Sequence, residues 1–209
     1  MTIPTPDPWP DSIEEDHGDL ILGDTQPIKT GRLRRYLREV LETIILAVAL
    51  FLIINAVTAR IRVDGNSMEP SFHHGNYVIV NKLAYRWGEI SRGDVIVFPS
   101  PENHDEDLIK RVIGLPGDRV WVKNGIVYVN EVPLDEPYIQ APMASDLREV
   151  VVPEGRVYVM GDNRNNSSDS RRWGPLEIEV ILGKAVFVYW PALDFGLVEH
   201  FVYPIDGDS

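Results

Sequence analysis

One apolar run near the N-terminus constrains this chain more than any other feature. Residues Thr43–Ala59 (TIILAVALFLIINAVTA) form a run of 17 positions without a charged side chain. As an α-helix the run would be about 25 Å long, close to the thickness of the hydrocarbon layer of a bilayer, and Val40 and Leu41 extend it. We therefore predict that residues 32–60 form a basic flank and a single membrane-spanning helix.

Three other interpretations of this run compete. A helix buried in a soluble core would have a polar face, whereas only Thr43, Asn55 and Thr58 are polar here. A helix lying flat in the membrane interface would carry a charged face. A cleavable signal peptide would explain the small residues Val57-Thr58-Ala59, but the long acidic segment before the run is atypical of one. A retained anchor is the interpretation that fits best.

Basic residues are distributed unequally on the two sides of the run. Five precede it (Lys29, Arg32, Arg34, Arg35 and Arg38) and two follow it (Arg60 and Arg62). Lys and Arg concentrate in the cytoplasmic flank of a membrane helix. The count therefore predicts a cell-membrane protein with a cytoplasmic N-terminus and with residues 61–209 outside the cytoplasm.

The charge of the chain is concentrated at its start. The 209 residues carry a net charge of −12, and residues 1–28 supply seven acidic and no basic side chains, interspersed with Pro and Gly. Such a composition cannot bury a core, so residues 1–31 are predicted to be a disordered acidic cytoplasmic tail. The acidic balance argues against nucleic-acid binding. The absence of cysteine excludes disulfides, thiolate metal sites and cysteine nucleophiles.

From residue 61 onward, short β-type runs alternate with Gly and Pro. The runs are Tyr77–Asn81, Asp94–Phe98, Val120–Lys123, Ile126–Asn130, Val150–Val152, Arg156–Met160 and Ala185–Trp190. Asn124-Gly125 separates two of them, which predicts a tight hairpin. Short strands with long connections favour a mainly β domain over residues 61–209 rather than alternating strands and helices.

Ser67 is the first side chain that could carry chemistry. It lies in Gly65-Asn66-Ser67-Met68-Glu69-Pro70, where a glycine-containing turn and a proline would hold its hydroxyl exposed, although serines in turns often have no such role. A serine nucleophile needs a base. No Gly-x-Ser-x-Gly elbow is present, and none of the histidines is placed beside a carboxylate that would orient it, so a Ser-His-Asp triad has little support. The histidines are His17, His73, His74, His104 and His200.

Lys110 is an alternative base. It lies inside the apolar run Asp107–Gly114, and burial of a lysine disfavours its charged form. Lowering its pKa from about 10.4 to 8 would need about 3.3 kcal/mol, which is within the range known for buried lysines. Taken alone, the run also fits an edge strand whose lysine faces water beside Arg111.

A polar loop, Gly161–Gly174, follows the apolar strand Arg156–Met160. It is rich in Asn, Ser, Asp and Arg. By itself this composition fits a self-bonded turn network with an Asp–Arg pair. It also fits a scaffold in which one hydroxyl orients a neutral base.

Together these segments resemble a known family, the type I signal peptidases (leader peptidases), which are membrane-anchored Ser/Lys serine endopeptidases. The resemblance covers about residues 38–191 and corresponds to a compact form of the family. The matching segments are Ser67–Pro70 (nucleophile motif), Gly75–Lys82 (the strand that follows it), Lys110–Asp118 (general-base box) and Gly161–Gly174 (last box). Each is ambiguous alone, but four in this order behind an anchor are specific.

The resemblance implies a fold and a function. The fold would be a catalytic domain of coiled antiparallel β-sheets, with a small β extension at about residues 119–150. The function would be removal of N-terminal signal peptides from exported preproteins at the outer face of the membrane, after Ala-x-Ala patterns, without a metal or organic cofactor. Two alternatives are a membrane-tethered β domain without enzymatic activity and a self-cleaving Ser/Lys regulatory protease. The latter would carry a DNA-binding helix-turn-helix and no anchor.

The resemblance also implies catalytic roles for individual residues. Ser67 would be the nucleophile and Lys110 the general base, with Ser167 hydrogen-bonded to the Lys110 amine to orient it. The Ser67 backbone N–H would hold the oxyanion. Some family members supply a second donor from a serine at the position that is Gly65 here.

Other residues of the matching segments would support the site. Asp169 and Arg171 would form an ion pair, Asp162 and Arg111 would assist, and Met68 would line the pocket for the small residue before the cut. An enzyme that cuts beside a bilayer is also expected to present aromatic side chains to it. We predict Phe72 and Trp87 for that role.

Overall fold

The computed structural model describes residues 30–203. Residues 1–29, where most of the predicted acidic tail falls, and residues 204–209 lie outside the described residues. The described residues divide into two units within helix α1 (Thr30–Val57), between Leu46 and Ala47.

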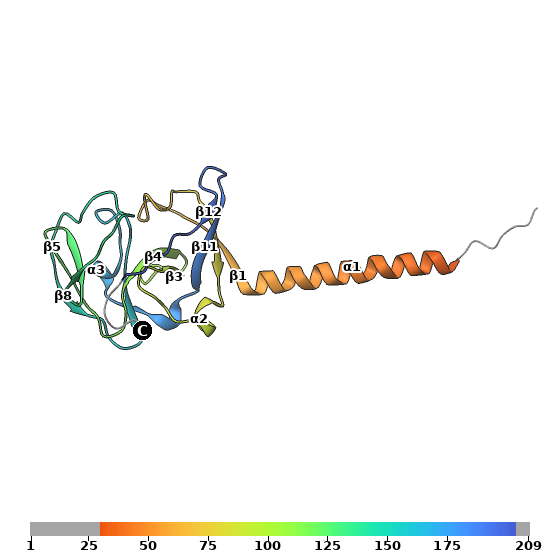
Figure 1. Ribbon diagram of the computed structural model, residues 1–209, viewed down its shortest axis with the longest axis horizontal. Coiled ribbons are helices and arrows are strands. Elements are labelled where there is room, and N and C mark those ends of the chain that lie inside the picture. Colours follow the sequence, from red (N-terminus) through yellow and green to blue (C-terminus); the bar gives the residue numbers. More distant parts are fainter. Residues whose placement is uncertain (1–29, 204–209) are drawn as a thin grey trace, which may run out of the picture. The chain divides into compact units, whose positions relative to one another are not determined.

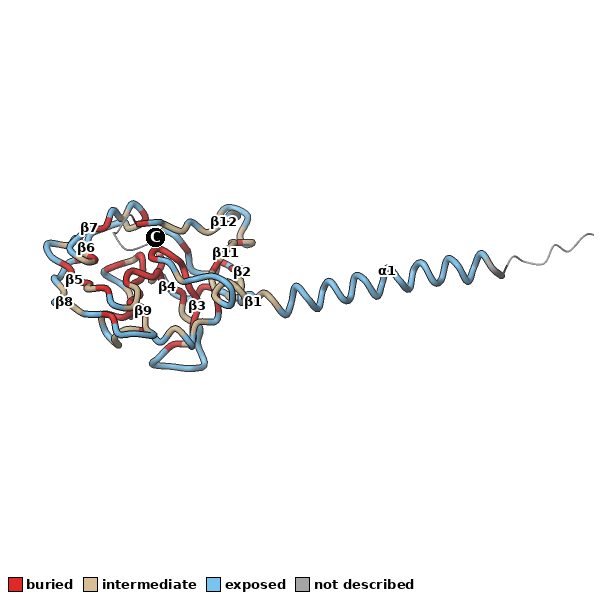
Figure 2. The backbone as a smooth tube through the Cα atoms, turned by 60° about the horizontal axis from the view of Figure 1, so that its bottom comes forward, coloured by how far each residue is buried: buried red, intermediate tan, exposed pale blue. Residues whose placement is uncertain are grey.

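Helix α1 is long and apolar enough to cross a membrane. Residues 32–56 of this helix are all exposed (Figure 2). The helix ends at Val57, three residues before the boundary we predicted. The difference arises because Thr58–Arg62 forms strand β1, which pairs with Asn81–Tyr77, so that cross-strand hydrogen bonds replace those of the helix.

The larger β-sheet (Figure 1) contains strands β1, β3, β4, β11 and β12 among others. Every pair of neighbouring strands in it is antiparallel. Its order is β1-β2-β11-β3-β4-β9-β10, and β12 pairs with β11. The bounds are β1 (Thr58–Arg62), β2 (Tyr77–Asn81), β3 (Val95–Pro99), β4 (Asp107–Gly114), β9 (Arg156–Met160), β10 (Leu176–Glu177), β11 (Gly183–Trp190) and β12 (Gly196–Leu197). The order places β4 between β3 and β9, inside the sheet.

A second, four-stranded sheet occupies the region predicted as the β extension. Its order is β7-β6-β5-β8, with bounds β5 (Arg119–Lys123), β6 (Ile126–Val129), β7 (Val132–Pro133) and β8 (Leu147–Val151). Asn124 and Gly125 have φ angles of 51° and 79°, so the predicted hairpin turn is of the type that needs positive φ at both positions. Short helices are α2 (Ala84–Trp87), α3 (Ser170–Trp173) and the 3-10 turn η1 (Ile178–Val180). The mainly β prediction is confirmed.

Strand β4 contributes one buried apolar side chain to each of the three core clusters. Ile109 packs with residues such as Val78 and Val80, Val112 packs with Ile96 and Phe98, and Ile113 packs in a cluster that both sheets share. Residues Ile109–Gly114 are consequently all buried. Any polar side chain on this stretch must therefore be satisfied inside the protein.

Gly93 and Gly117 offer a matched test of this packing. Their φ angles are +87° and +86°, but a Cβ atom at Gly93 would overlap the carbonyl oxygen of Phe201, whereas Gly117 has open space. We expect Gly117→Ala to cost about 1 kcal/mol, the usual penalty for this backbone region. Gly93→Ala must also separate two backbones, so its loss should be several-fold larger. Denaturant unfolding of both variants in detergent micelles measures this, and equal losses would contradict the close approach.

Candidate active site

The structure brings Ser67 and Lys110 together. Lys110 lies on β4, Ser67 lies in the turn between β1 and β2, and Lys110 Nζ is 2.7 Å from Ser67 Oγ. The amine also donates a hydrogen bond of 2.9 Å to the carbonyl oxygen of Ile109. A serine hydroxyl in direct contact with an amine is the arrangement that transfer of the hydroxyl proton to that amine requires.

The surroundings of Lys110 favour its neutral form. The side chain is among the largest that are fully buried. Burial lowers the pKa of its amine from 10.5 to about 8, against the opposing effect of the Asp169 and Asp162 carboxylates, while the Arg171 cation lowers the pKa further. A substantial fraction of the amine is then unprotonated slightly above neutral pH, as a general base must be.

Packing holds the turn that carries Ser67. The backbone N–H of Phe72 donates to the Met68 carbonyl at 2.9 Å, and both side chains are buried in the core, at 2% and 1% exposure. Our expectation that Phe72 enters a membrane is therefore wrong, because its ring is packed in the core of the domain. Trp87 is 84% exposed and stays a candidate. The role of Met68 beside a substrate stays a prediction.

The backbone N–H of Ser67 is not engaged by the rest of the turn. Within residues 30–203 the Ser67 N–H has no acceptor, whereas the N–H of Gly65 donates to Nδ1 of His74 at 3.1 Å. Gly65 has a φ of +90°, which a residue with a side chain rarely adopts. The Ser67 N–H is thus available to bind an oxyanion, and the backbone conformation gives a local reason for glycine at position 65.

The end of β9 approaches Ser67 closely at Gly161. A Cβ atom there would overlap both the Ser67 carbonyl oxygen and the Ser167 hydroxyl. Ser167 therefore lies at the site, but its Oγ is buried without a hydrogen-bond partner among the described residues. The predicted Ser167–Lys110 hydrogen bond is not formed in the structure, because the amine hydrogen-bonds instead to Ser67 Oγ and the Ile109 carbonyl.

Asp169 and Arg171 form a two-fold ion pair. Arg171 Nε lies 2.7 Å from Asp169 Oδ1, and Nη2 lies 2.6 Å from Oδ2. Asp169 also accepts the N–H of Gly161 at 3.0 Å and caps helix α3. The pair thus ties α3 to the residue at which β9 meets the site, while its part in activity stays a prediction.

Arg111 and Asp162 form a second pair, which is fully buried. Arg111 Nε and Nη2 lie 2.9 and 2.7 Å from the two carboxylate oxygens of Asp162, and the side chains are 1% and 0% exposed. Ser71 donates a hydrogen bond of 2.6 Å to the same carboxylate. The residue after Lys110 is therefore anchored to the loop that contains Ser167.

The sequence did not single out Asn163, although it lies in the predicted loop. Its backbone N–H donates to the Ser67 carbonyl at 3.0 Å, and its side-chain amide donates to the Asn66 carbonyl at 3.0 Å. Both bonds join the loop to the nucleophile turn. An asparagine in a loop rich in Asn gives no local signal of such a contact, which joins residues about 100 positions apart.

None of the four histidines within residues 30–203 is bonded to Ser67 or Lys110. His73, His104 and His200 contact Asp194, the Ser100 carbonyl and the Val95 N–H, respectively. His17 lies outside the described residues. In this same part of the chain, no three His, Asp or Glu side chains are grouped to hold a metal ion.

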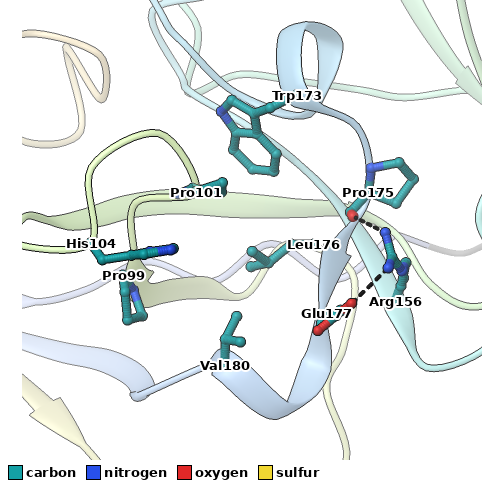
Figure 3. A pocket seen from close by; sticks show the side chains of 9 residues that line it. All are labelled: Pro99, Pro101, His104, Arg156, Trp173, Pro175, Leu176, Glu177 and Val180. Atoms are coloured by element: carbon teal, nitrogen blue, oxygen red, sulfur yellow. Dashed lines mark hydrogen bonds and ion pairs between the residues drawn. The ribbon is translucent and has the colours of Figure 1, made fainter.

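A cavity of about 480 Å³ has a lining that does not include the dyad (Figure 3). Trp173, Leu176 and Val180 line it together with three prolines, and an Arg156–Glu177 ion pair borders it. Neither Ser67 nor Lys110 lines this cavity, so the cavity is not the candidate active site.

Comparisons with known proteins identify the family of the chain. A family model described as "Signal peptidase, peptidase S26" matches residues 37–190. Signal peptidase I of Bacillus caldolyticus is 43% identical over 181 residues, which cover 80% of this chain and 96% of the relative. Signal peptidase IB of Staphylococcus aureus (strain COL) is 37% identical over 180 residues, covering 76% and 93%. A crystal structure of a signal peptidase I from Enterococcus faecalis V583 aligns at 33% identity and a TM-score of 0.43, covering 46% of this chain and 96% of its own.

The lowered pKa of Lys110 predicts a pH-dependent stability. Because the folded pKa (about 8) lies below the unfolded value (10.5), burial of the protonated amine costs up to about 3 kcal/mol below pH 8, and the cost disappears as pH rises toward 10.5. Lys110→Met removes the charge, so it should be more stable than the parent at pH 7, with a difference that shrinks above pH 8. Unfolding titrations between pH 6 and 10.5 test this; a difference independent of pH would show that the amine is not desolvated.

Proposed function

Because the chain belongs to the signal peptidase family, peptidase S26, we propose that it removes N-terminal signal peptides from exported preproteins with Ser67 as nucleophile and Lys110 as general base. The observation that carries the mechanism is the 2.7 Å contact between Ser67 Oγ and Lys110 Nζ. Family membership makes the chain a serine endopeptidase, and the contact supports the assignment of these two side chains.

In the first half of the reaction, the neutral Lys110 amine takes the hydroxyl proton as Ser67 Oγ attacks the carbonyl carbon of the scissile peptide bond. The carbonyl oxygen becomes an oxyanion, which the free N–H of Ser67 stabilises. The protonated amine then gives its proton to the leaving amino group, and an ester between Ser67 and the signal peptide remains.

In the second half, Lys110 acts again as the base. It takes a proton from water, which attacks the ester, and it returns that proton to Ser67 Oγ as the signal peptide leaves. Ser167 would orient the amine by accepting one of its N–H groups, since the Ser167 hydroxyl is buried at the site with no other partner among the described residues. Hydrogen bonds of this kind often form only when substrate has bound.

The ion pairs around the dyad would hold its parts in place. Asp169–Arg171 fixes the backbone of Gly161, and Arg111–Asp162 fixes the residue next to Lys110. We propose that the substrates carry small residues before the cut, in the Ala-x-Ala pattern, and that Met68 borders their pocket. Gly65 contributes no hydroxyl, so the Ser67 N–H is the proposed oxyanion donor. The proposed chemistry uses no metal and no organic cofactor.

The family and the exposed apolar helix indicate a membrane-anchored protein. We propose that α1 crosses the cell membrane once and that its basic flank lies in the cytoplasm, following the Lys and Arg count. The proposed domains are then a cytoplasmic tail (1–31), the anchor (32–60) and an extracytoplasmic peptidase domain (61–209). The last of these would meet preproteins where their signal peptides emerge from the lipid bilayer.

Activity should depend on pH as a lysine base requires. The rate constant kcat/KM for a preprotein should rise with pH through an acidic limb near pH 8, because the protonated amine cannot accept the Ser67 proton. Ser67→Ala and Lys110→Arg should both be inactive, the latter because a guanidinium stays protonated at every working pH. Cleavage by the protein in detergent, measured between pH 6 and 10, checks this.

Replacement of all five histidines provides the matched control. This variant should retain most of the activity and the same acidic limb, since none of the four described histidines contacts the dyad. Activity in Lys110→Arg, or its loss on replacing a single histidine, would show that the base is misassigned.

The proposed orientation predicts the outcome of proteolysis on intact cells. Protease added to the outside should degrade residues 61–209 and leave a fragment that includes the tail and α1. Antibodies against epitopes at the two ends of the chain distinguish the fragments, and permeabilised cells serve as the control. Protection of the C-terminal epitope in intact cells would reverse the topology.

A further inference from the structure

A short segment after β7 reaches from the second sheet to the loop of the candidate site. Glu136 in this segment receives Nη1 and Nη2 of Arg164 at 2.7 and 2.6 Å. The two side chains are 5% and 1% exposed, so this is a buried, two-fold ion pair. Burial would lower the pKa of Arg164, but the contacts with Glu136 outweigh it and keep the guanidinium charged.

Arg164 connects Glu136 to the loop that contacts the nucleophile. Its Nε donates to the Gly161 carbonyl at 3.1 Å, and its own carbonyl accepts a hydrogen bond from Arg171. The preceding residue, Asn163, is bonded through its backbone N–H to the carbonyl of Ser67. Glu136 is thus linked to the nucleophile through one arginine and one turn of the loop.

Tyr138 links the same segment to the other half of the dyad. The Arg111 guanidinium lies over the Tyr138 ring, 4.1 Å from its centre, where the face of the ring attracts a cation. The Tyr138 hydroxyl donates to Glu136 at 2.8 Å and accepts from Arg164 at 3.2 Å. Tyr138 thus contacts Arg111, which directly follows Lys110, and Arg164, which directly follows the residue that is bonded to the Ser67 carbonyl.

We propose that Glu136 and Tyr138, which belong to none of the segments that identified the family, are positioning residues that hold Ser67 and Lys110 in place from the connection between β7 and β8. The proposal rests on the proposed function of the dyad. It gives the segment between β7 and β8 of the small sheet a part in the reaction. Glu136 and Tyr138 hold Arg164 and Arg111 in fixed positions. Arg164 in turn supports the Asn163–Ser67 contact, and Arg111 supports the position of Lys110 on β4.

A merely structural role would lower the amount of folded protein and nothing else. A positioning role predicts two further changes when the contacts of Glu136 and Tyr138 with Arg164 and Arg111 are weakened. First, kcat falls while KM changes little, because the nucleophile and base are misplaced and the binding surface is not. Second, water reaches the Lys110 amine, so its pKa rises and the acidic limb moves to higher pH. Loss of the Glu136 charge alone would shift that pKa in the opposite direction.

The test compares Glu136→Gln and Tyr138→Phe with Glu131→Gln in the full-length protein in detergent. Glu131 pairs with Arg119 in the same small sheet, and its exposed side chain provides a matched loss of an Arg–Glu pair. Preprotein cleavage gives kcat, KM and the pH profile, and thermal unfolding corrects each rate for the folded fraction. We expect a loss of about tenfold or more in kcat for Glu136→Gln, with an upward shift of the acidic limb, and no change for Glu131→Gln.

Coupling between Glu136 and Arg164 is measured in the variant that carries Glu136→Gln and Arg164→Gln together. If the pair acts as one unit, the double variant is no worse than the worse single variant. If Glu136→Gln does not fold, Tyr138→Phe keeps the ring under Arg111 and should show a smaller fall in kcat with the same shift in pH. Unchanged kcat per folded molecule and an unmoved acidic limb in the variants that fold would overturn the proposal. An inactive parent would instead overturn the proposed function.

Discussion

The burial of strand β4 is the constraint on which the rest of the site depends. Two adjacent basic residues, Lys110 and Arg111, occupy this strand, and successive side chains on a strand point to opposite faces. Neither can reach water, so each must be satisfied internally. Lysine can give up its proton, and its pKa falls accordingly. Arginine cannot, so Arg111 stays charged and is surrounded by Asp162, two backbone carbonyls and two aromatic rings.

The charged arginines of the site help to keep the Lys110 amine neutral. A neutral amine is useful to a serine only if nearby carboxylates do not restore its proton, and Asp162 and Asp169 both act to raise the pKa of Lys110. Each carboxylate, however, is engaged by its own arginine in a two-fold ion pair. The arginines therefore neutralise the charges that the loop brings close to the base. Burial remains the dominant effect on the pKa of Lys110, while Arg111 on β4 pairs with Asp162 and Arg171 in the loop pairs with Asp169.

Local patterns in the sequence predicted much of the fold, and distant contacts decided what they missed. Runs with β-type composition became β2, β5, β9 and β11 nearly as expected, and Asn124-Gly125 formed its turn, since these depend on neighbours in the chain. The predicted end of α1 was wrong because Thr58–Arg62 pairs with β2 as a strand. Ser67 and Lys110 were found through motif resemblance. The contribution of Glu136 and Tyr138 was not found, because their partners lie 26 or more positions away in the sequence.

Phe72 shows how one misassigned residue explains a feature of the site. Its aromatic ring is packed in the core with Met68, four residues before it, so the apolar side of the nucleophile turn is anchored to the main sheet. The polar side of the same turn is held by Asn163, through the carbonyls of Asn66 and Ser67. A turn held from both sides keeps the carbonyls of Asn66, Ser67 and Met68 engaged, while the Ser67 hydroxyl contacts Lys110 and the Ser67 N–H has no acceptor within residues 30–203. Because those two groups must act on the same substrate carbonyl, the rigidity that Phe72 supplies from the core contributes directly to the geometry of attack.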